Sequence, residues 1–124
     1  MKLVDYEYNS TIFNVDFKNK INLLVDNSGT GKTFLLSMLK FYCDDNNITC
    51  THIDYIHRSI PLEGDILLFD KADLYFNNEL FNKLKNLDAI SIISIKNTTR
   101  LDMFGDIGMY RLINKGDKVY TEKY

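Results

Sequence analysis

Apolar and polar residues alternate along the first twenty positions of the chain, as they do in strands that bury one face. The apolar members of this stretch are Leu3, Tyr6, Tyr8, Ile12, Phe13, Val15 and Phe17. A polar turn at Asn9-Ser10 divides the stretch, so the pattern predicts two short strands. The next apolar run, residues 21–25, is β-branched at both ends, which predicts a short buried strand.

A turn-rich stretch at 26–31 follows, and after it the apolar spacing becomes helical. The apolar residues there are Phe34, Leu35, Met38, Leu39 and Tyr42. Their i, i+4, i+5, i+8 spacing predicts an amphipathic helix with one buried face. A polar cluster of poor helix formers at 44–47 predicts where that helix ends.

Further apolar runs predict strands at 48–54, 66–70 and 89–95. Between the last two runs the sequence predicts a second helix, for which either Asn77 or Asn78 is a suitable N-cap. The apolar residues predicted to share one side of this helix are Leu80, Phe81, Leu84 and Leu87.

The last part of the chain predicts a hairpin, with strands at 109–113 and 118–121 around a turn at 114–117. Residues 97–104 allow one or two helical turns. Strands that alternate with helices in the middle of the chain predict parallel pairing, and hence an α/β fold. Antiparallel hairpins at both ends make the predicted sheet mixed but mostly parallel, and the length of 124 residues fits one domain over 1–124.

Composition narrows the classes of function. The formal net charge is −2, which argues against general binding to nucleic acid or to an anionic membrane, and no clear nucleic-acid patch is visible. No apolar run approaches the roughly 20 residues of a membrane span, and 1–20 contain no apolar leader. Cys43 and Cys50 are expected to be reduced, partly buried thiols of a cytoplasmic protein. The predicted strand places Cys50, His52 and Asp54 on one face, where they could bind a metal ion. No second pair of ligands has the spacing of a zinc site, so this alternative is weak.

The strongest chemical signal is Asp-Asn-Ser-Gly-Thr-Gly-Lys-Thr at 26–33, between a predicted buried strand and a predicted helix. Glycines let a loop turn its main-chain N–H groups inward, and a helix that starts there adds the positive end of its dipole. Lys32 can reach phosphate as a mobile point charge, and the Thr33 hydroxyl is a suitable ligand for Mg²⁺. The predicted phosphate-binding residues are Asn27, Ser28, Gly29, Thr30, Gly31, Lys32 and Thr33.

A second signal is Ile-Leu-Leu-Phe-Asp at 66–70, four apolar residues that end in an acid 37 residues after Thr33. Together the two stretches resemble the Walker A loop and Walker B strand of the P-loop NTPases, in particular the additional-strand division of ABC-like and AAA-like ATPases. The loop departs from the family at Asp26, which replaces its first glycine. The resemblance implies a three-layer P-loop core that binds ATP, with Mg²⁺ held by Thr33 and by Asp70.

The residue after Asp70 also departs from the family pattern. Many members of this division carry a glutamate there, which polarises the attacking water, whereas this chain has Lys71. An ammonium group is a poor proton acceptor, so Lys71 is expected to neutralise phosphate or to pair with Asp26 or Asp73.

The resemblance also implies a polar sensor of the terminal phosphate at the end of the strand inserted beside the P-loop strand. The polar residues at that place are Ser94, Lys96, Asn97 and Thr98. Asn97 or Thr98 is the expected sensor, so the candidate catalytic residues are Asp70, Lys71 and Asn97. Arg58 and Arg100 are further candidates for phosphate contact.

These features predict a module that binds ATP or another nucleotide, with weak or absent hydrolysis of its own. It would act as a nucleotide-dependent switch or as a subunit that binds a protein partner. Two alternatives stay open. One is an active small ATPase, and the other is a non-enzymatic modulator from a phage or other mobile element, built on a degenerate P-loop fold.

Overall fold

The computed structural model describes residues 1–25, 31–54 and 62–124. In these residues the chain forms one sheet of eight strands, two α-helices and a short 3₁₀ helix. The elements are β1 (Lys2–Tyr8), β2 (Thr11–Asp16), β3 (Ile21–Leu24), α1 (Lys32–Asp45), β4 (Cys50–Ile53), β5 (Ile66–Phe69), η1 (Ala72–Leu74), α2 (Asn78–Lys85), β6 (Ile90–Ser94), β7 (Ile107–Asn114) and β8 (Lys118–Lys123). The predicted α/β class is therefore confirmed.

The sheet has the strand order β1-β2-β8-β7-β3-β6-β5-β4. Its middle strands run parallel, since β3 pairs with β6 and with β7, and β5 pairs with β4 and with β6. The hairpins β1–β2 and β7–β8 are antiparallel, and β2 joins β8 in parallel. The prediction of a mixed, mostly parallel sheet with antiparallel hairpins near both ends of the chain is confirmed.

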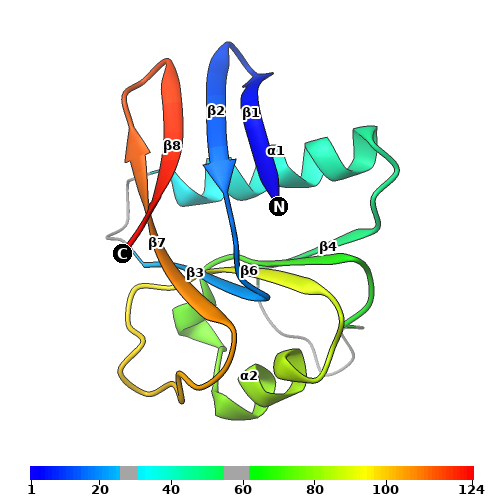
Figure 1. Ribbon diagram of the computed structural model, residues 1–124, viewed down its shortest axis with the longest axis vertical. Helices are drawn as coiled ribbons and strands as arrows, with labels where there is room; N and C mark the ends of the chain where they lie inside the picture. Colours follow the sequence, from blue (N-terminus) through cyan, green and yellow to red (C-terminus); the bar gives the residue numbers. More distant parts are fainter. Residues whose placement is uncertain (26–30, 55–61) are drawn as a thin grey trace.

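Helices α1 and α2 lie on opposite sides of the central strands (Figure 1). On the α1 side, Leu35, Leu36 and Leu39 belong to a core that also contains Leu24, Leu68 and Ile92 from the sheet. On the α2 side, the core contains Phe81 and Leu84 with the alternate sheet residues Leu23, Leu67 and Ile93. Strands buried on both faces read as continuous apolar runs, which explains the sequence of β5.

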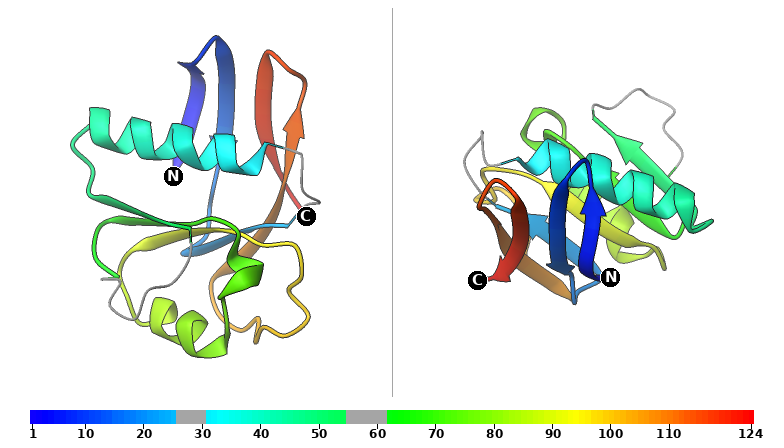
Figure 2. Two further views of the ribbon diagram at one scale, coloured as in Figure 1. Left: turned by 180° about the vertical axis from the view of Figure 1, so that it is seen from behind. Right: turned by 90° about the horizontal axis from the view of Figure 1, so that it is seen from above.

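The two hairpins, β1–β2 and β7–β8, extend from the central strands along one side of α1. The helix therefore lies against both the central strands and these hairpins (Figure 2). Strand β7 joins the central strands to the hairpin β7–β8, since residues 107–110 pair with β3 and residues 110–114 pair with β8. Gly108 is needed near its start, because an added Cβ there would collide with the Asn19 side chain. The Asn19 side chain accepts a hydrogen bond from the Tyr110 hydroxyl at 2.7 Å. This bond links the residues that precede β3 to strand β7.

The predicted helix boundaries agree with the structure. Helix α1 ends at Asp45, within the predicted polar cluster. Asn77 is the N-cap of α2, and its side-chain oxygen accepts a hydrogen bond from the N–H of Leu80 at 2.9 Å. The predicted apolar side is confirmed for Leu80, Phe81 and Leu84, which are buried, whereas Leu87 follows the helix and is partly buried.

Residues 97–104 form a loop that contains no helix. It includes one hydrogen-bonded turn, in which the N–H of Leu101 donates to the carbonyl oxygen of Thr98 at 3.0 Å. Side chains from the neighbouring elements hold its backbone. The Asp73 carboxylate accepts hydrogen bonds from the N–H groups of Lys96 and Asn97, and the Asn78 amide bonds to the backbone of Arg100 and of Asp102. Such side-chain to backbone bonds compete with the helical pattern. Within the described segments, neither helix is long and apolar enough to cross a membrane.

Candidate functional site

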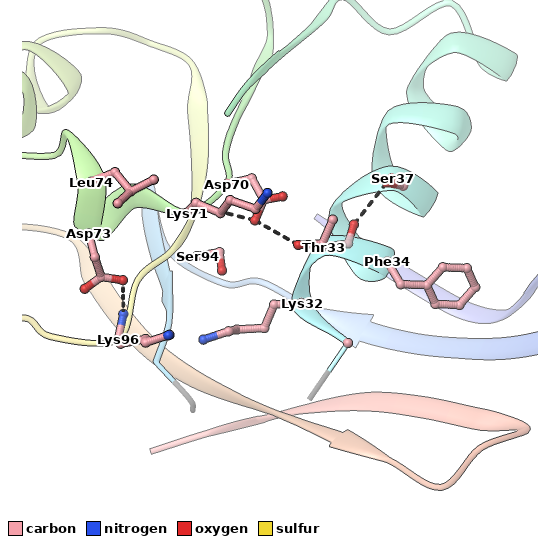
Figure 3. A pocket seen from close by; sticks show the side chains of 11 residues that line it. Lys32, Thr33, Phe34, Ser37, Asp70, Lys71, Asp73, Leu74, Ser94 and Lys96 are labelled. Carbon is pink, nitrogen blue, oxygen red and sulfur yellow. Dashed lines mark hydrogen bonds between the residues drawn. The ribbon is translucent and has the colours of Figure 1, made fainter. Parts of the chain in front are cut away.

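A cavity of about 890 Å³ lies where the carboxyl ends of β5 and β6 meet the start of α1 (Figure 3). Parallel strands place their carboxyl ends at the same edge of a sheet, and ligands of α/β proteins bind preferentially there. The residues that line the cavity are Gly31, Lys32, Thr33, Phe34, Ser37, Asp70, Lys71, Asp73, Leu74, Ser94 and Lys96. The structure therefore brings together residues of both predicted motifs.

The contact that joins the two motifs is a hydrogen bond from Thr33 to Asp70. The Thr33 hydroxyl donates to Oδ1 of Asp70 at 3.2 Å, across 37 residues of sequence. Asp70 is buried with 3% of its surface exposed, whereas Thr33 is exposed in the first turn of α1. The same carboxylate oxygen accepts the main-chain N–H of Lys71 at 3.0 Å. Two oxygen ligands suited to a hard cation thus meet at one wall of the cavity.

Lys32 is the first residue of α1, and its side chain extends into the cavity (Figure 3). It is buried with 8% of its surface exposed. Gly31 precedes it with a φ of +93°, a left-handed conformation that glycine adopts without a Cβ penalty. The first turn of α1 carries no acidic residue. The positive end of the helix dipole and the Lys32 ammonium group therefore act in the same direction on an anion in the cavity.

Lys71 lines the cavity in a left-handed backbone conformation, with a φ of +51°. A non-glycine residue held there stores roughly 1 kcal/mol or more of strain. The conformation turns the chain from β5 into η1, for which Lys71 is the N-cap. Lys71 and Asp73 are both described by the structure, and no ion pair joins them. The other expected partner, Asp26, lies outside the described residues.

At the end of β6, neither of the expected sensors, Asn97 and Thr98, lines the cavity. Ser94, with 5% of its surface exposed, and Lys96 line the cavity. Asn97 is exposed and is not among the lining residues, and its side-chain oxygen accepts hydrogen bonds from both the N–H and the hydroxyl of Thr99. Both carboxylate oxygens of Asp73 hold the backbone here, since they accept hydrogen bonds from the N–H groups of Lys96 and Asn97.

Several predicted phosphate contacts stay predictions. Thr98 and Arg100 are described, and neither lines the cavity. The remaining predicted phosphate contacts lie outside the described part of the chain; these are Asn27, Ser28, Gly29, Thr30 and Arg58. The described part of the proposed phosphate-binding loop is therefore Gly31, Lys32 and Thr33.

Tyr75 supports the site although the sequence did not single it out. Its hydroxyl lies 2.7 Å from the carbonyl oxygen of Asp70 and 3.1 Å from that of Ile53, so it joins the ends of β5 and β4. Burial raises the pKa of Tyr75 well above its ordinary value, and the negative charges of Asp70 and Asp54 raise it further. The phenol therefore stays neutral and keeps donating its hydrogen bond. Nothing in the local pattern marks this tyrosine, because its partners come from two strands.

The described residues do not support a metal site at Cys50, His52 and Asp54. No three His, Cys, Asp or Glu side chains among them gather closely enough to hold a metal ion. Cys50 instead lies beside Cys43, and both are free thiols that are more completely buried than the partly buried thiols that the sequence predicted. The Nε2 atom of His52 is buried and makes no hydrogen bond. The cavity at the ends of β5 and β6 thus remains the candidate site.

Comparisons with known proteins give no further evidence about this site. Comparison of the chain with protein-family models, with curated proteins and with solved structures finds no match. The functional argument therefore rests on the residues of this chain and on the chemistry that they bring together.

Proposed function

We propose that this chain is an ATP-binding P-loop protein with weak or absent hydrolysis of its own, which acts as a nucleotide-dependent switch or as a partner-binding module. The observation that carries the proposal is the hydrogen bond between Thr33 and Asp70 beside the Lys32 side chain. Two motifs chosen from local sequence alone, and separated by 37 residues, meet at one cavity. A chance match of either motif would not require them to meet.

The strand order supports membership of the additional-strand division of the P-loop class. Strand β6 lies between β3, the strand before the loop, and β5, the strand that ends before Asp70. This is the position of the inserted strand that the sequence resemblance implies. Helices on opposite sides of the central strands are also consistent with a three-layer P-loop core (Figure 1).

The donors at the cavity fit the parts of a magnesium nucleotide. Lys32 and the start of α1 would bind the β- and γ-phosphates, together with the predicted loop residues 27–30 that lie outside the described segments. The Thr33 hydroxyl and the Asp70 carboxylate are oxygen ligands of the kind that Mg²⁺ prefers. When bound, the metal neutralises charge on the phosphates.

The described lining offers no carboxylate suited to activate water. One of its two carboxylates is that of Asp70, which accepts hydrogen bonds from the Thr33 hydroxyl and from the N–H of Lys71. The other is that of Asp73, which accepts hydrogen bonds from two main-chain N–H groups. Lys71 stands where a glutamate would serve as base, and an ammonium group cannot accept a proton. This arrangement supports binding without efficient hydrolysis.

Nucleotide titration tests the binding part of the proposal. Mg-ATP and Mg-GTP are titrated calorimetrically into the wild type, Lys32→Ala and Thr33→Val. The matched lysine control is Lys83→Ala, an exposed residue of α2 that does not line the cavity. We expect wild type and Lys83→Ala to bind alike, and Lys32→Ala to lose about tenfold or more in affinity, since it removes a charged contact. Circular dichroism melting checks that each variant is folded. Absence of binding at millimolar nucleotide by a folded wild type would reject the proposal in favour of a non-enzymatic interaction protein.

Phosphate release tests the part of the proposal that concerns hydrolysis. We expect negligible turnover in the wild type, and a measurable rate in Lys71→Glu if the missing carboxylate is what limits the chemistry. An unchanged rate in a folded, nucleotide-binding Lys71→Glu would remove that explanation. Clear turnover by the wild type, abolished in Asp70→Ala, would instead identify an active small ATPase.

A further inference from the structure

The β7–β8 hairpin contacts the chain both after β3 and before α1. After β3, the N–H of Val25 donates to the carbonyl oxygen of Tyr110 at 2.9 Å, and the Tyr124 hydroxyl donates to the carbonyl oxygen of Val25 at 3.2 Å. Before α1, Gly31 lies against the side chain of Asn114, which ends β7. Both views in Figure 2 place this hairpin beside the start of α1. The hairpin is therefore in position to hold two segments that meet at the candidate site.

The contact between Asn114 and Gly31 is close. A Cβ atom added to Gly31 would lie 3.1 Å from Nδ2 of Asn114, nearer than an ordinary contact between such atoms. The other end of the Asn114 amide belongs to the hairpin turn, since Oδ1 accepts the N–H of Gly116 at 2.8 Å. The N–H of Lys115 donates to the carbonyl oxygen of Lys118 at 2.8 Å and closes that turn. One side chain thus joins the turn at 114–117 to the residue that precedes α1.

The position of Gly31 matters because Lys32 and Thr33 follow it directly. These two residues form the first turn of α1 and line the cavity. A helix start attracts an anion only where its N–H groups point, and binding groups must be held within about 0.5 Å of their productive geometry. A side chain that fixes Gly31 therefore affects how well the start of α1 binds phosphate.

We propose that the β7–β8 hairpin regulates the nucleotide site through Asn114, a positioning residue that holds Gly31 and the start of α1 in the arrangement that binds phosphate. The inference rests on the proposed function, and it adds an element that contributes nothing to the described lining of the cavity. Coupling between two parts of a protein is reciprocal. Bound nucleotide therefore stabilises the turn at 114–117, and a partner that binds this hairpin changes the affinity for nucleotide.

The variant Asn114→Ser separates the two contacts of this side chain. A serine hydroxyl can still accept the N–H of Gly116, but it is too short to keep the contact with Gly31. The matched control is Asp117→Ser, which shortens an exposed side chain of nearly the same size in the same turn. We expect calorimetric titration with a slowly hydrolysed Mg-ATP analogue to show an affinity about fivefold lower in Asn114→Ser and unchanged in Asp117→Ser. Circular dichroism melting checks that both variants are folded.

Hydrogen exchange measured by NMR gives a second arm, which a purely structural role of Asn114 would not move. The N–H of Lys115 reports on the hairpin turn, and the N–H of Asn86, which bonds to the carbonyl oxygen of Lys83 at 3.2 Å, reports on the end of α2. Both amides lie in exposed turns, which exchange through local opening. We expect a saturating Mg-ATP analogue to slow exchange at Lys115 about fivefold in wild type, and to leave Asn86 unchanged. In Asn114→Ser the slowing at Lys115 should be lost.

Several outcomes would overturn the inference while leaving the proposed function intact. One is a folded Asn114→Ser that binds nucleotide as tightly as wild type, and another is an equal loss of affinity in Asp117→Ser, which would indicate general damage to the turn. Unchanged exchange at Lys115 in nucleotide-bound wild type would also overturn it, and this measurement decides the matter even if Asn114→Ser fails to fold. A folded wild type that binds no nucleotide would instead reject the proposed function and this inference with it.

Discussion

Cys43 and Cys50 show how burial changes the chemistry of a single residue. They lie beside one another near the end of α1 and at the start of β4, with 0% and 9% of their surfaces exposed. Burial raises the pKa of both thiols, and the neighbouring Cys43 helps to raise that of Cys50 to about 12. Lys40, whose ammonium group bonds to the carbonyl oxygen of Cys50 at 3.0 Å, opposes this increase only in part.

These raised pKa values predict a loss of stability in alkali. The native thiol of Cys50 keeps its proton to about pH 12, whereas the unfolded thiol releases it near its ordinary pKa of 9.0. The unfolded state binds fewer protons in this range, so the free energy of unfolding falls as pH rises from about 9. We expect Cys50 to account for about 1 kcal/mol between pH 8.5 and about pH 10. Urea denaturation across this range should give a steeper fall for wild type than for Cys50→Ala, and parallel slopes would contradict the assignment.

At the scale of elements, α2 depends on its cap because it is short. It spans eight residues, and only Leu80, Phe81 and Leu84 bury its apolar side. The Asn77 side chain satisfies one of the four N–H groups that a helix start leaves without a helical acceptor. The remaining surface of α2 is polar, so neither intrinsic propensity nor area burial replaces that bond.

Removal of the cap should therefore destabilise the protein measurably. We expect Asn77→Ala to lower the free energy of unfolding by about 1 kcal/mol. Asn82→Ala, in the exposed interior of the same helix, is the matched control, and it should be neutral or slightly stabilising because alanine favours helix. Chemical denaturation of both variants measures the difference. Equal effects would mean that the bond to Leu80 contributes nothing.

At the scale of the whole molecule, the candidate site joins segments that are far apart in sequence. Its residues come from the start of α1, the turn after β5 and the end of β6, and these segments are joined by the same sheet, with one core on each of its sides. Such a site forms only when the sheet is complete. A ligand that binds there stabilises the entire fold, because the unfolded chain does not bring these groups together.

Ligand-linked stability follows from that assembly and from the proposed function. Mg-ATP at about 100 times its dissociation constant should raise the free energy of unfolding by about 2.7 kcal/mol. Differential scanning fluorimetry should show a clearly smaller rise in melting temperature for Lys32→Ala than for wild type, since a tenfold loss of affinity leaves only about 1.4 kcal/mol of stabilisation at the same nucleotide concentration. A shift of equal size in both proteins would place the ligand elsewhere on the molecule.

The sequence by itself determined the local elements and one half of the site. Periods of 2 and 3.6 residues in the apolar pattern identified both hairpins, the buried strands and the two helices, because each period reflects which face a local element buries. The Gly-Lys-Thr run at 31–33 was recognisable for the same reason, since the strand before it and the helix that it starts are near neighbours along the chain. Asp70 was also identifiable, as the acid that ends an apolar strand.

Only the tertiary structure decided which of these parts meet. The hydrogen bond from Thr33 to Asp70 depends on the register of parallel strands, and that register is set by packing over the whole sheet. The presence of Lys96 at the cavity depends on two main-chain bonds to Asp73, a residue from another element. Local patterns encode burial and periodicity, whereas the direction of a loop depends on partners distant in sequence, and so no local pattern could specify it.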